Sequence, residues 1–499
     1  MTTSAYRDVH TNRACCIARP ARPAGIFAPV HGPEKWLFAA VIVALSGIAG
    51  CTETDNPSPA GSGGSGGNGG SATAGAAGTG GSATAGAAGT GGTGAAGTGG
   101  TGGSADAGQG DSGGIPPDSG SIGPLGGTPT RPQLTKEQAA EYTILKYLER
   151  AGDVAAPVID NWDPTAGIGD VTTFTPQYTV AASGGTHTSI QAAVDAAVAA
   201  GATTRAYISV APGTYRELVC VPSSGPAITL YGTNPDAAAT VIVKDNYSGK
   251  PKANGESANP CNANLTGTTY GTSGSATFAA YAKDFQAKNL TLSNDTDESA
   301  VAAATAVQAV ALMAQGDKQV FENVRVLGNQ DTLYVKSAGP GVVARAYFKN
   351  CYVEGDVDFV FGRATFVLDG CELKYLTSRV AAGNGAVVAP STDARNGYGI
   401  LVINSKLTAE SAPAGTAYLG RAWDEGAGDL AGYTTAVMTG IYPNGQVVIR
   451  ESVLDAQVRP VDPWRPAATT NRPFSSTAGT YPANRLYEYN NTGPGSAPP

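Results

Sequence analysis

Short apolar strands interrupted by single turn residues fill the second half of this 499-residue chain. Each unit has an aromatic or aliphatic run, one Asn or Gly, and a second short apolar run, as in residues 346–353 and 365–373. The turn residues recur at intervals of 34, 27, 20 and 34, at Asn289, Asn323, Asn350, Gly370 and Asn404. Strand-rich repeats of about 20 to 50 residues indicate a solenoid. The pattern predicts an all-β fold, a right-handed parallel β-helix, with a β-sandwich as the alternative.

Two helices are predicted before the strands. In residues 189–200, Ile190, Val194 and Val198 share one helical face. Thr188 and Gln191 have the spacing of a capping box at the start of this segment. We expect this short N-terminal helix to cap the open end of the coil. Residues 133–150 form the second predicted helix.

The first 130 residues do not have the composition of a folded domain. The apolar run 36–49 is too short to span a bilayer but fits a signal-peptide core. Small residues precede Cys51 and resemble a lipobox, which predicts a lipoprotein signal peptide over 1–51, lipidated at Cys51; an ordinary signal peptide with an incidental cysteine is the alternative. Residues 52–130, mostly Gly, Ser, Ala and Thr, predict a disordered linker. We therefore expect an exported, membrane-anchored lipoprotein at the outer membrane or cell surface, with its folded domain at 131–499.

Charge and residue counts exclude several kinds of site. The formal net charge is −8, which argues against nucleic acid as a partner. Of three histidines only His187 lies in the folded part, so a multi-histidine metal site is excluded. Export makes disulfides plausible. Cys351 and Cys371 occupy equivalent points of successive repeats and are the predicted pair, whereas Cys220 and Cys261 are left open.

Residues 355–362 contain two carboxylates in an apolar strand. Because a strand repeats every second residue, Asp356 and Asp358 should share one face, and Val357, Phe359 and Phe361 the other. Burying a carboxylate costs more than packing returns. The stretch is therefore a candidate site, although a strand at a solvent edge can also carry acids.

Polar clusters on other repeats would stack near this strand, because the same strand of successive coils forms one face. They are Gln308, then Gln330 with Asp331, then Arg421 with Trp423. Together with Asp358 and the segments 213–217 and 271–278, they resemble the motifs of the pectinesterases, carbohydrate esterases that remove methyl groups from pectin. The motifs appear in the order of that family, and the resemblance runs from about Phe174 to the C-terminus.

The resemblance implies an ester hydrolase without cofactor or metal. Asp358, beside Arg421, would attack the ester carbonyl as a carboxylate. Asp331, near another negative charge, would have a raised pKa and serve as acid and base. Gln308 and Gln330 would donate hydrogen bonds to the oxyanion.

The resemblance also implies a sugar-binding surface. Its substrate contacts are Thr272, Gln308, Tyr334, Phe361, Arg421 and Trp423. The expected partner is pectin or an oligogalacturonide, bound by a monomer. Ala422 replaces the proline usual before the tryptophan, and Asp356 stands where threonine is common. The C-terminal segments resemble the outer-membrane lipoprotein branch of the family, some members of which are reported to act as acyl-CoA thioesterases.

Three alternatives to a pectinesterase remain. A thioesterase or other ester hydrolase could use the same carboxylate pair. A pectate lyase would share the β-helix but requires a calcium-binding acid cluster, for which only Asp356 and Asp358 are candidates. A non-catalytic β-helical carbohydrate-binding protein would have no use for Asp331, Asp358 and Arg421 together.

Overall fold

The computed structural model describes residues 123–253, 256–257, 259–261, 267–301, 306–377, 385–411 and 413–497. The predicted signal peptide, its Cys51 and most of the predicted linker lie outside the described residues. Strand β1 (Gly126–Thr128) falls within the range predicted as linker. No helix in the described ranges is both long and apolar enough to cross a membrane.

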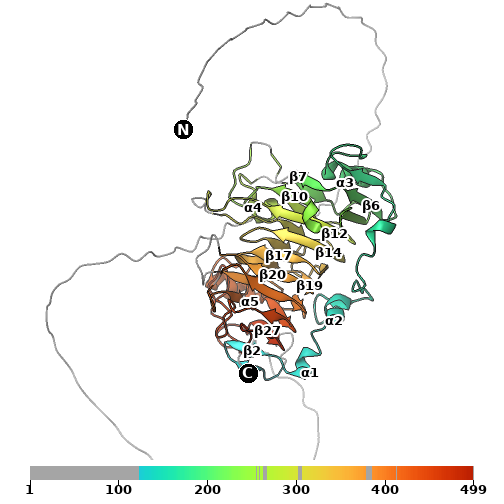
Figure 1. The fold of residues 1–499 in the computed structure, drawn as a ribbon. Helices are drawn as coiled ribbons and strands as arrows, with labels where there is room; N and C mark the ends of the chain where they lie inside the picture. The colour runs from blue at the N-terminus through green and yellow to red at the C-terminus, as the bar shows by residue number, and fades with distance from the viewer. Residues whose placement is uncertain are drawn as a thin grey trace, which may run out of the picture. The chain divides into compact units, whose positions relative to one another are not determined.

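Parallel strands from successive coils stack on one another, as Figure 1 shows from β6 to β27. One wall is a seven-stranded sheet in which every pairing is parallel. Its members are β8 (Val219–Val221), β11 (Phe278–Ala280), β13 (Leu312–Ala314), β15 (Leu333–Val335), β18 (Val357–Gly362), β21 (Ala386–Pro390) and β24 (Tyr418–Gly420). The prediction of a right-handed parallel β-helix is confirmed.

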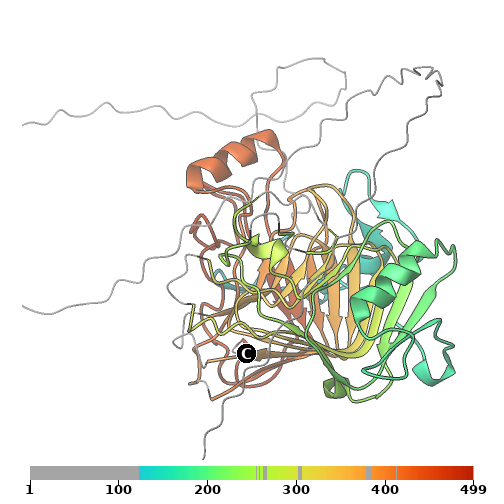
Figure 2. The same ribbon diagram turned by 90° about the horizontal axis from the view of Figure 1, so that it is seen from above.

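The remaining walls belong to one larger sheet. Its coil strands are β5 (Tyr178–Val180), β6 (Ala206–Val210), β7 (Gly213–Tyr215), β9 (Ile228–Gly232), β10 (Thr240–Lys244), β12 (Gln286–Asn294), β14 (Gln319–Leu327), β16 (Arg345–Lys349), β17 (Tyr352–Gly355), β19 (Thr365–Asp369), β20 (Glu372–Tyr375), β22 (Ile400–Ile403), β23 (Lys406–Ala409), β25 (Gln446–Arg450), β26 (Val453–Leu454) and β27 (Arg485–Tyr489). Short 3₁₀ turns lie at Val171–Thr173 and Ala237–Ala239. Figure 2 shows α5 (Leu430–Thr439) outside the stacked strands.

The turn residues recognised in the sequence form a ladder of left-handed backbone. Asn289, Asn323 and Asn350 have φ of 56°, 51° and 52°, and Gly370 has 64°. Asn and Gly tolerate this conformation better than other residues. Asn323 Nδ2 donates to Asn289 Oδ1 at 2.8 Å, which links one coil to the next. The repeat of Asn and Gly therefore marks the corner of each coil.

Aromatic side chains stack along the coil interior, and α3 (Ile190–Ala199) covers the first coil. Rings of Phe321 and Phe348 lie 4.6 Å apart at 8°. The helix buries Ile190 and Val194 in the same core, so the predicted cap is confirmed. Its N-cap is Ser189, not Thr188, because the Ser189 side chain accepts from the amide of Ala192.

The motif segment 213–217 has a structural role at this cap. Glu217 accepts hydrogen bonds from the backbone amides of Ile190 at 2.8 Å and Gln191 at 3.0 Å. A carboxylate at a helix N-terminus satisfies free amides and complements the helix dipole. Glu217 thus fixes α3 to the coil.

Residues 123–176, called here the N-terminal arm, run along the outside of the larger sheet. At its start β2 (Arg131–Gln133) pairs with β27, the last strand of the coil. Arg131 hydrogen-bonds both carboxylate oxygens of buried Glu488, at 2.7 and 2.8 Å. The arm continues through α1 (Lys136–Ala139), α2 (Ile144–Glu149), β3 (Arg150–Ala151) and β4 (Val158–Ile159). The segment predicted as one helix is therefore two short helices.

The disulfide prediction was wrong. Cys220 and Cys261 form the disulfide, whereas Cys351 and Cys371 are free and buried. The two free thiols stack in successive coils, where each donates to a carbonyl one coil earlier, Cys351 to Phe321 and Cys371 to Phe348. Cys371 Sγ also accepts the backbone amide of Cys351 at 3.4 Å, so both thiols are engaged with backbone groups.

Candidate active site

Backbone hydrogen bonds stack the two candidate carboxylates in adjacent coils. The amide of Asp331 donates to the carbonyl of Val357 at 3.1 Å, and the amide of Asp356 donates to the carbonyl of Asn329 at 3.1 Å. Asp331 and Asp358 both have left-handed backbone, with φ of 64° and 49°. The structure therefore brings Asp331 next to Asp358, although 27 positions separate them in the sequence.

A register shift between Val357 and Val360 changes which side chains share a face in β18. Phe359 and Val360 both lie in the inner core, whereas Phe361 lies in a separate cluster on the outer face. The expectation that Val357, Phe359 and Phe361 share one face was wrong, because a bulge offsets the two-residue period. The bulge is also what leaves Phe361 on the side of the candidate site.

Arg421 and Asp358 form an ion pair through two nitrogens of the guanidinium group. Arg421 Nε lies 2.9 Å from Asp358 Oδ1, and Nη2 lies 2.6 Å from Oδ2. The amide of Arg421 donates to the carbonyl of Val388 at 3.0 Å, which places the arginine one strand beyond β21. A planar guanidinium held in this way fixes the orientation of the carboxylate.

Asp331 lies in a setting that favours its protonated form. Burial raises the pKa of Asp331 well above the usual value, and the nearby charges of Asp358 and Glu298 raise it further. Arg421 acts in the opposite direction but does not cancel the rise. One carboxyl with a raised pKa beside an ion-paired carboxylate is an arrangement suited to acid–base chemistry.

Glu298 is a site residue that the sequence did not reveal. It is only 2% exposed, and its Oε1 accepts the backbone amide of Gln330 at 3.1 Å. Its segment, Asn-Asp-Thr-Asp-Glu-Ser, has the composition of a solvated turn. No local signal distinguishes Glu298 from the exposed acids beside it, because its burial depends on the next coil.

The two glutamines also lie in adjacent coils. The amide of Ala309 donates to the carbonyl of Gln330 at 3.2 Å, which aligns the segment of Gln308 with that of Gln330. Gln308 Oε1 is buried and has no hydrogen-bond partner among the described residues. Both side chains are half-buried, so each amide can reach a bound molecule while its backbone stays fixed.

Three aromatic side chains line the outer face beside the carboxylates. The rings of Tyr334 and Phe361 stack 4.2 Å apart at 12°, and the ring of Trp423 meets Phe361 edge-on at 5.7 Å. Lys336 Nζ lies 5.5 Å from the Tyr334 ring and 3.4 Å from Ser273 Oγ. This contact brings α4 (Gly271–Gly274), which carries half-buried Thr272, to the same wall.

The disulfide lies at one end of this wall. Strand pairing places one residue from each of six successive strands in a column on the outer face of the seven-stranded sheet. The column starts at the disulfide and contains two of the three aromatic residues: Cys220, Ala279, Met313, Tyr334, Phe361 and Ala389. The bond to Cys261 ties the loop after β10 to this column. Within the described residues no group of three or more His, Cys, Asp or Glu side chains is placed to hold a metal ion.

Comparison with known proteins identifies the same family as the sequence motifs. The pectinesterase family model matches residues 177–447. A pectinesterase of Ralstonia solanacearum is 47% identical over 372 residues, which cover 74% of this chain and 92% of that protein. The solved structure of rice weevil pectin methyl esterase is 32% identical, with a TM-score of 0.62 over 74% of this chain and 99% of that one.

The chain is also similar to a protein that is named as a thioester hydrolase and not as a pectinesterase. The putative acyl-CoA thioester hydrolase YbhC of Escherichia coli is 32% identical over 408 residues, covering 74% of this chain and 90% of that protein. Its crystal structure has a TM-score of 0.63 to this chain, over 74% of this chain and 96% of that one.

Proposed function

This chain belongs to the pectinesterase family and is a carboxylic ester hydrolase that demethylesterifies pectin, and we propose that Asp358 is its nucleophile and Asp331 its acid and base. The observation that carries the assignment is the stacking of the two carboxyl groups in adjacent coils. Arg421 holds Asp358 through two guanidinium nitrogens, whereas burial and neighbouring charge raise the pKa of Asp331. Two residues of the same type, both aspartates, are thereby prepared for different tasks.

In the first step Asp358 attacks the carbonyl carbon of a galacturonate methyl ester. The carbonyl oxygen becomes an oxyanion, to which the side-chain amides of Gln308 and Gln330 donate hydrogen bonds. The bond to the methoxy group then breaks, and Asp331 gives it a proton, so methanol leaves. The galacturonyl group remains on Asp358 as an anhydride, a covalent intermediate.

In the second step water opens the anhydride. Asp331, now a carboxylate, takes a proton from the water molecule as its oxygen attacks the sugar carbonyl carbon. The bond to Asp358 breaks, and the products are the Asp358 carboxylate and galacturonic acid, which releases its proton to solvent and becomes galacturonate. Asp331 is protonated again, so the site returns to its starting state without any other reactant.

The outer wall favours a sugar over a thioester as the substrate. Half-buried Trp423, backed by the buried rings of Tyr334 and Phe361, gives the site an aromatic face on which the apolar face of a sugar ring can pack. Thr272 and Arg421 would supply polar contacts beside these aromatic rings. We therefore prefer methyl-esterified homogalacturonan or its oligomers over acyl-CoA.

The test is methanol release from methylated pectin by the full chain. Asp358→Asn is expected to abolish turnover, and Asp331→Asn to lower it by about 10³-fold, within the range measured for loss of a positioned acid–base group. Asp317→Asn is a matched control. Asp317 also forms an ion pair with an arginine, Arg345, at 2.8 Å, but this pair lies outside the candidate active site. Full activity of Asp358→Asn would exclude the mechanism, and turnover of palmitoyl-CoA instead of pectin would favour the thioesterase.

We also propose that the chain is exported, lipidated at Cys51 and held near a membrane by the linker 52–130, and that it works as a monomer. Support comes from the apolar run 36–49, the small residues before Cys51 and the composition of the linker. Detergent-phase partitioning tests this: the natural chain should enter the detergent phase, and Cys51→Ser should remain in the aqueous phase. Light scattering of the detergent-free Cys51→Ser form tests the monomer.

A further inference from the structure

A pocket lies between the N-terminal arm and the segment before β22, and it encloses about 260 Å³. Its lining residues include Glu141, Tyr142, Arg150, Val154, Pro157 and Tyr398. The arm packs on the outer face of the larger sheet, through a cluster that includes Val367, Leu401 and Val448. The candidate catalytic residues belong to the seven-stranded sheet instead. The pocket is therefore separate from the active site.

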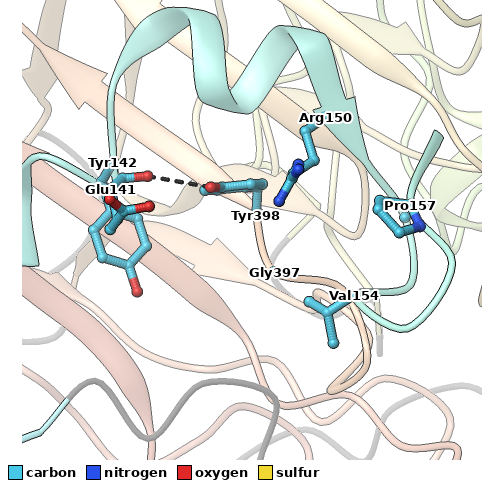
Figure 3. A pocket seen from close by; sticks show the side chains of 8 residues that line it. Glu141, Tyr142, Arg150, Val154, Pro157, Gly397 and Tyr398 are labelled. Carbon is cyan, nitrogen blue, oxygen red and sulfur yellow. Dashed lines mark hydrogen bonds between the residues drawn. The ribbon is translucent and has the colours of Figure 1, made fainter. Parts of the chain in front are cut away.

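Figure 3 shows the ring of Tyr398 in the middle of the pocket, with Glu141 and Tyr142 on one side and Val154 and Pro157 on the other. The Tyr398 hydroxyl donates to the Glu141 carbonyl at 3.2 Å, which fixes the direction of the ring. The ring of Tyr142 meets it edge-on at 6.2 Å and 81°. Tyr398 is half-buried, so part of this held ring remains open to solvent. A fixed aromatic face between apolar walls suits the C–H face of a sugar ring.

Arg150 brings a positive charge to the same pocket. Its guanidinium is directed toward Tyr398 in Figure 3, and its charge acts on the Tyr398 phenol. Arg150 is exposed and makes no side-chain hydrogen bond or ion pair with any residue in the described ranges. An arginine in this state is available for a planar carboxylate, which it binds with two parallel hydrogen bonds.

The other charge in the pocket is already balanced. Glu141 forms an ion pair with Lys146 at 2.6 Å, so Arg150 is the charged side chain among the lining residues that has no ion-pair partner in the described part of the chain. The free carboxylate oxygen of Glu141 can accept hydrogen bonds from sugar hydroxyls. In a chain with a net charge of −8, this local positive charge favours an anionic ligand.

We propose that this pocket binds one unesterified galacturonate unit of the pectin chain, with Arg150 on its carboxylate and Tyr398 under its ring. The proposal rests on the proposed function, because each turnover converts a neutral methyl ester into such a carboxylate. The volume is slightly below the roughly 300–1,000 Å³ of pockets for drug-sized ligands, which fits a single sugar unit. The pocket then retains the enzyme on stretches of pectin that it has already demethylated.

Calorimetric titration of the full chain with trigalacturonate tests the proposal. The natural chain should bind at two sites: the aromatic wall of the active site, formed by Tyr334, Phe361 and Trp423, and the pocket. Arg150→Gln should weaken the pocket site by about tenfold, the scale of one lost charge-assisted contact, while the wall site remains. Trp423→Ala should give the opposite pattern, losing the wall site and keeping the pocket site. Tyr398→Ala is a second variant that should also lose the pocket site.

Arg325→Gln is the matched control, because Arg325 also lies over a tyrosine ring, 5.2 Å from the centre of Tyr352, but outside the pocket. It should bind like the natural chain. Unchanged trigalacturonate binding by Arg150→Gln would overturn the proposal. Methanol release from a short methylated oligogalacturonide is measured in parallel and should be the same for Arg150→Gln and the natural chain. If the natural chain releases no methanol, the proposed function fails, whereas the binding difference still decides the pocket.

Discussion

Arg421 holds both oxygens of the Asp358 carboxylate, at 2.9 Å through Nε and at 2.6 Å through Nη2. The two residues are 63 positions apart and come from strands separated by β21. The ion pair thus fixes the direction of the proposed nucleophile from a position two coils further along. In the proposed mechanism the reactivity of Asp358 depends on this orientation as well as on its charge.

The first prediction concerns that orientation. Arg421→Lys keeps the charge but offers a single ammonium in place of the planar fork. We expect kcat on methylated pectin to fall by about 10²-fold, the loss that a displacement of about 1 Å can cause. Steady-state kinetics measure it, with Arg216→Lys as the control, since Arg216 pairs with exposed Asp295 at 2.7 Å. Equal kcat for Arg421→Lys and the natural chain would show that charge alone suffices.

The second prediction separates activity from stability at Asp331. The pKa of Asp331 is raised in the folded protein, mainly by burial. As pH rises above the ordinary Asp value of about 3.9, the unfolded chain ionises at this residue before the folded one does, so the free energy of unfolding decreases. Asp331→Asn removes this loss, so it should be about 10³-fold less active yet more stable than the natural chain at pH 7.

Thermal melting at two pH values measures this effect. At pH 3 both states carry the proton, so Asp331→Asn and the natural chain should have similar Tm values. Asp317→Asn should instead lose stability at pH 7, because it breaks the pair with buried Arg345. A lower Tm of Asp331→Asn at pH 7 would contradict the assigned environment.

The third prediction concerns Glu298, whose charge raises the pKa of Asp331. Glu298→Gln keeps an oxygen to accept the Gln330 amide but removes the charge. The pKa of Asp331 should fall, so the protonated acid disappears at a lower pH. The basic limb of the kcat–pH profile should therefore move toward acid.

The control for this variant is Glu322→Gln. Glu322 also accepts a backbone amide, from Ile168 at 2.6 Å, but lies on the other sheet. Its pH profile should match that of the natural chain. An unmoved basic limb in Glu298→Gln would mean that Glu298 only anchors the backbone of Gln330.

The fourth prediction concerns the disulfide. Cys220 and Cys261 close a loop with a sequence separation of 41. Cys261→Ser should lower the free energy of unfolding by about 2–4 kcal/mol, as expected for a loop of this size. Denaturant unfolding with and without a reductant measures the change. Cys351→Ala is the control because it removes a free thiol. A reductant should therefore destabilise Cys351→Ala as much as it destabilises the natural chain. Peptide mapping that finds Cys351 joined to Cys371 would contradict the pairing of Cys220 with Cys261.

The coil corners could be predicted because each leaves a local signal. Left-handed backbone selects Asn and Gly, so the spacing of Asn289 and Asn323 is enough to reveal the repeat. The catalytic candidates carry motif residues in a fixed order. What the sequence could not supply was the register between coils, because the bulge at β18 and the position of Phe359 depend on pairing with β21.

Contacts between distant residues were missed for the same reason. Arg131 and Glu488 are 357 positions apart, and neither has neighbours that indicate burial. Equivalent positions in two repeats suggested that Cys351 and Cys371 would bond, but both thiols are free and donate to backbone carbonyls. The residue that pairs with Cys220 lies in a loop outside the repeat, so periodicity gave no information about it.

The pairing of β2 with β27 has a consequence for the order in which the molecule is completed. Coils of a solenoid ordinarily contact only their neighbours, so each can form as soon as the one before it exists. Here β2, which pairs with β1 on one side, cannot pair on its other side until β27 has been synthesised. An incomplete chain would expose two open strand edges, at β2 and at the unfinished end, and such edges recruit other chains. Release of a full-length chain is therefore the event that ends its vulnerability to aggregation.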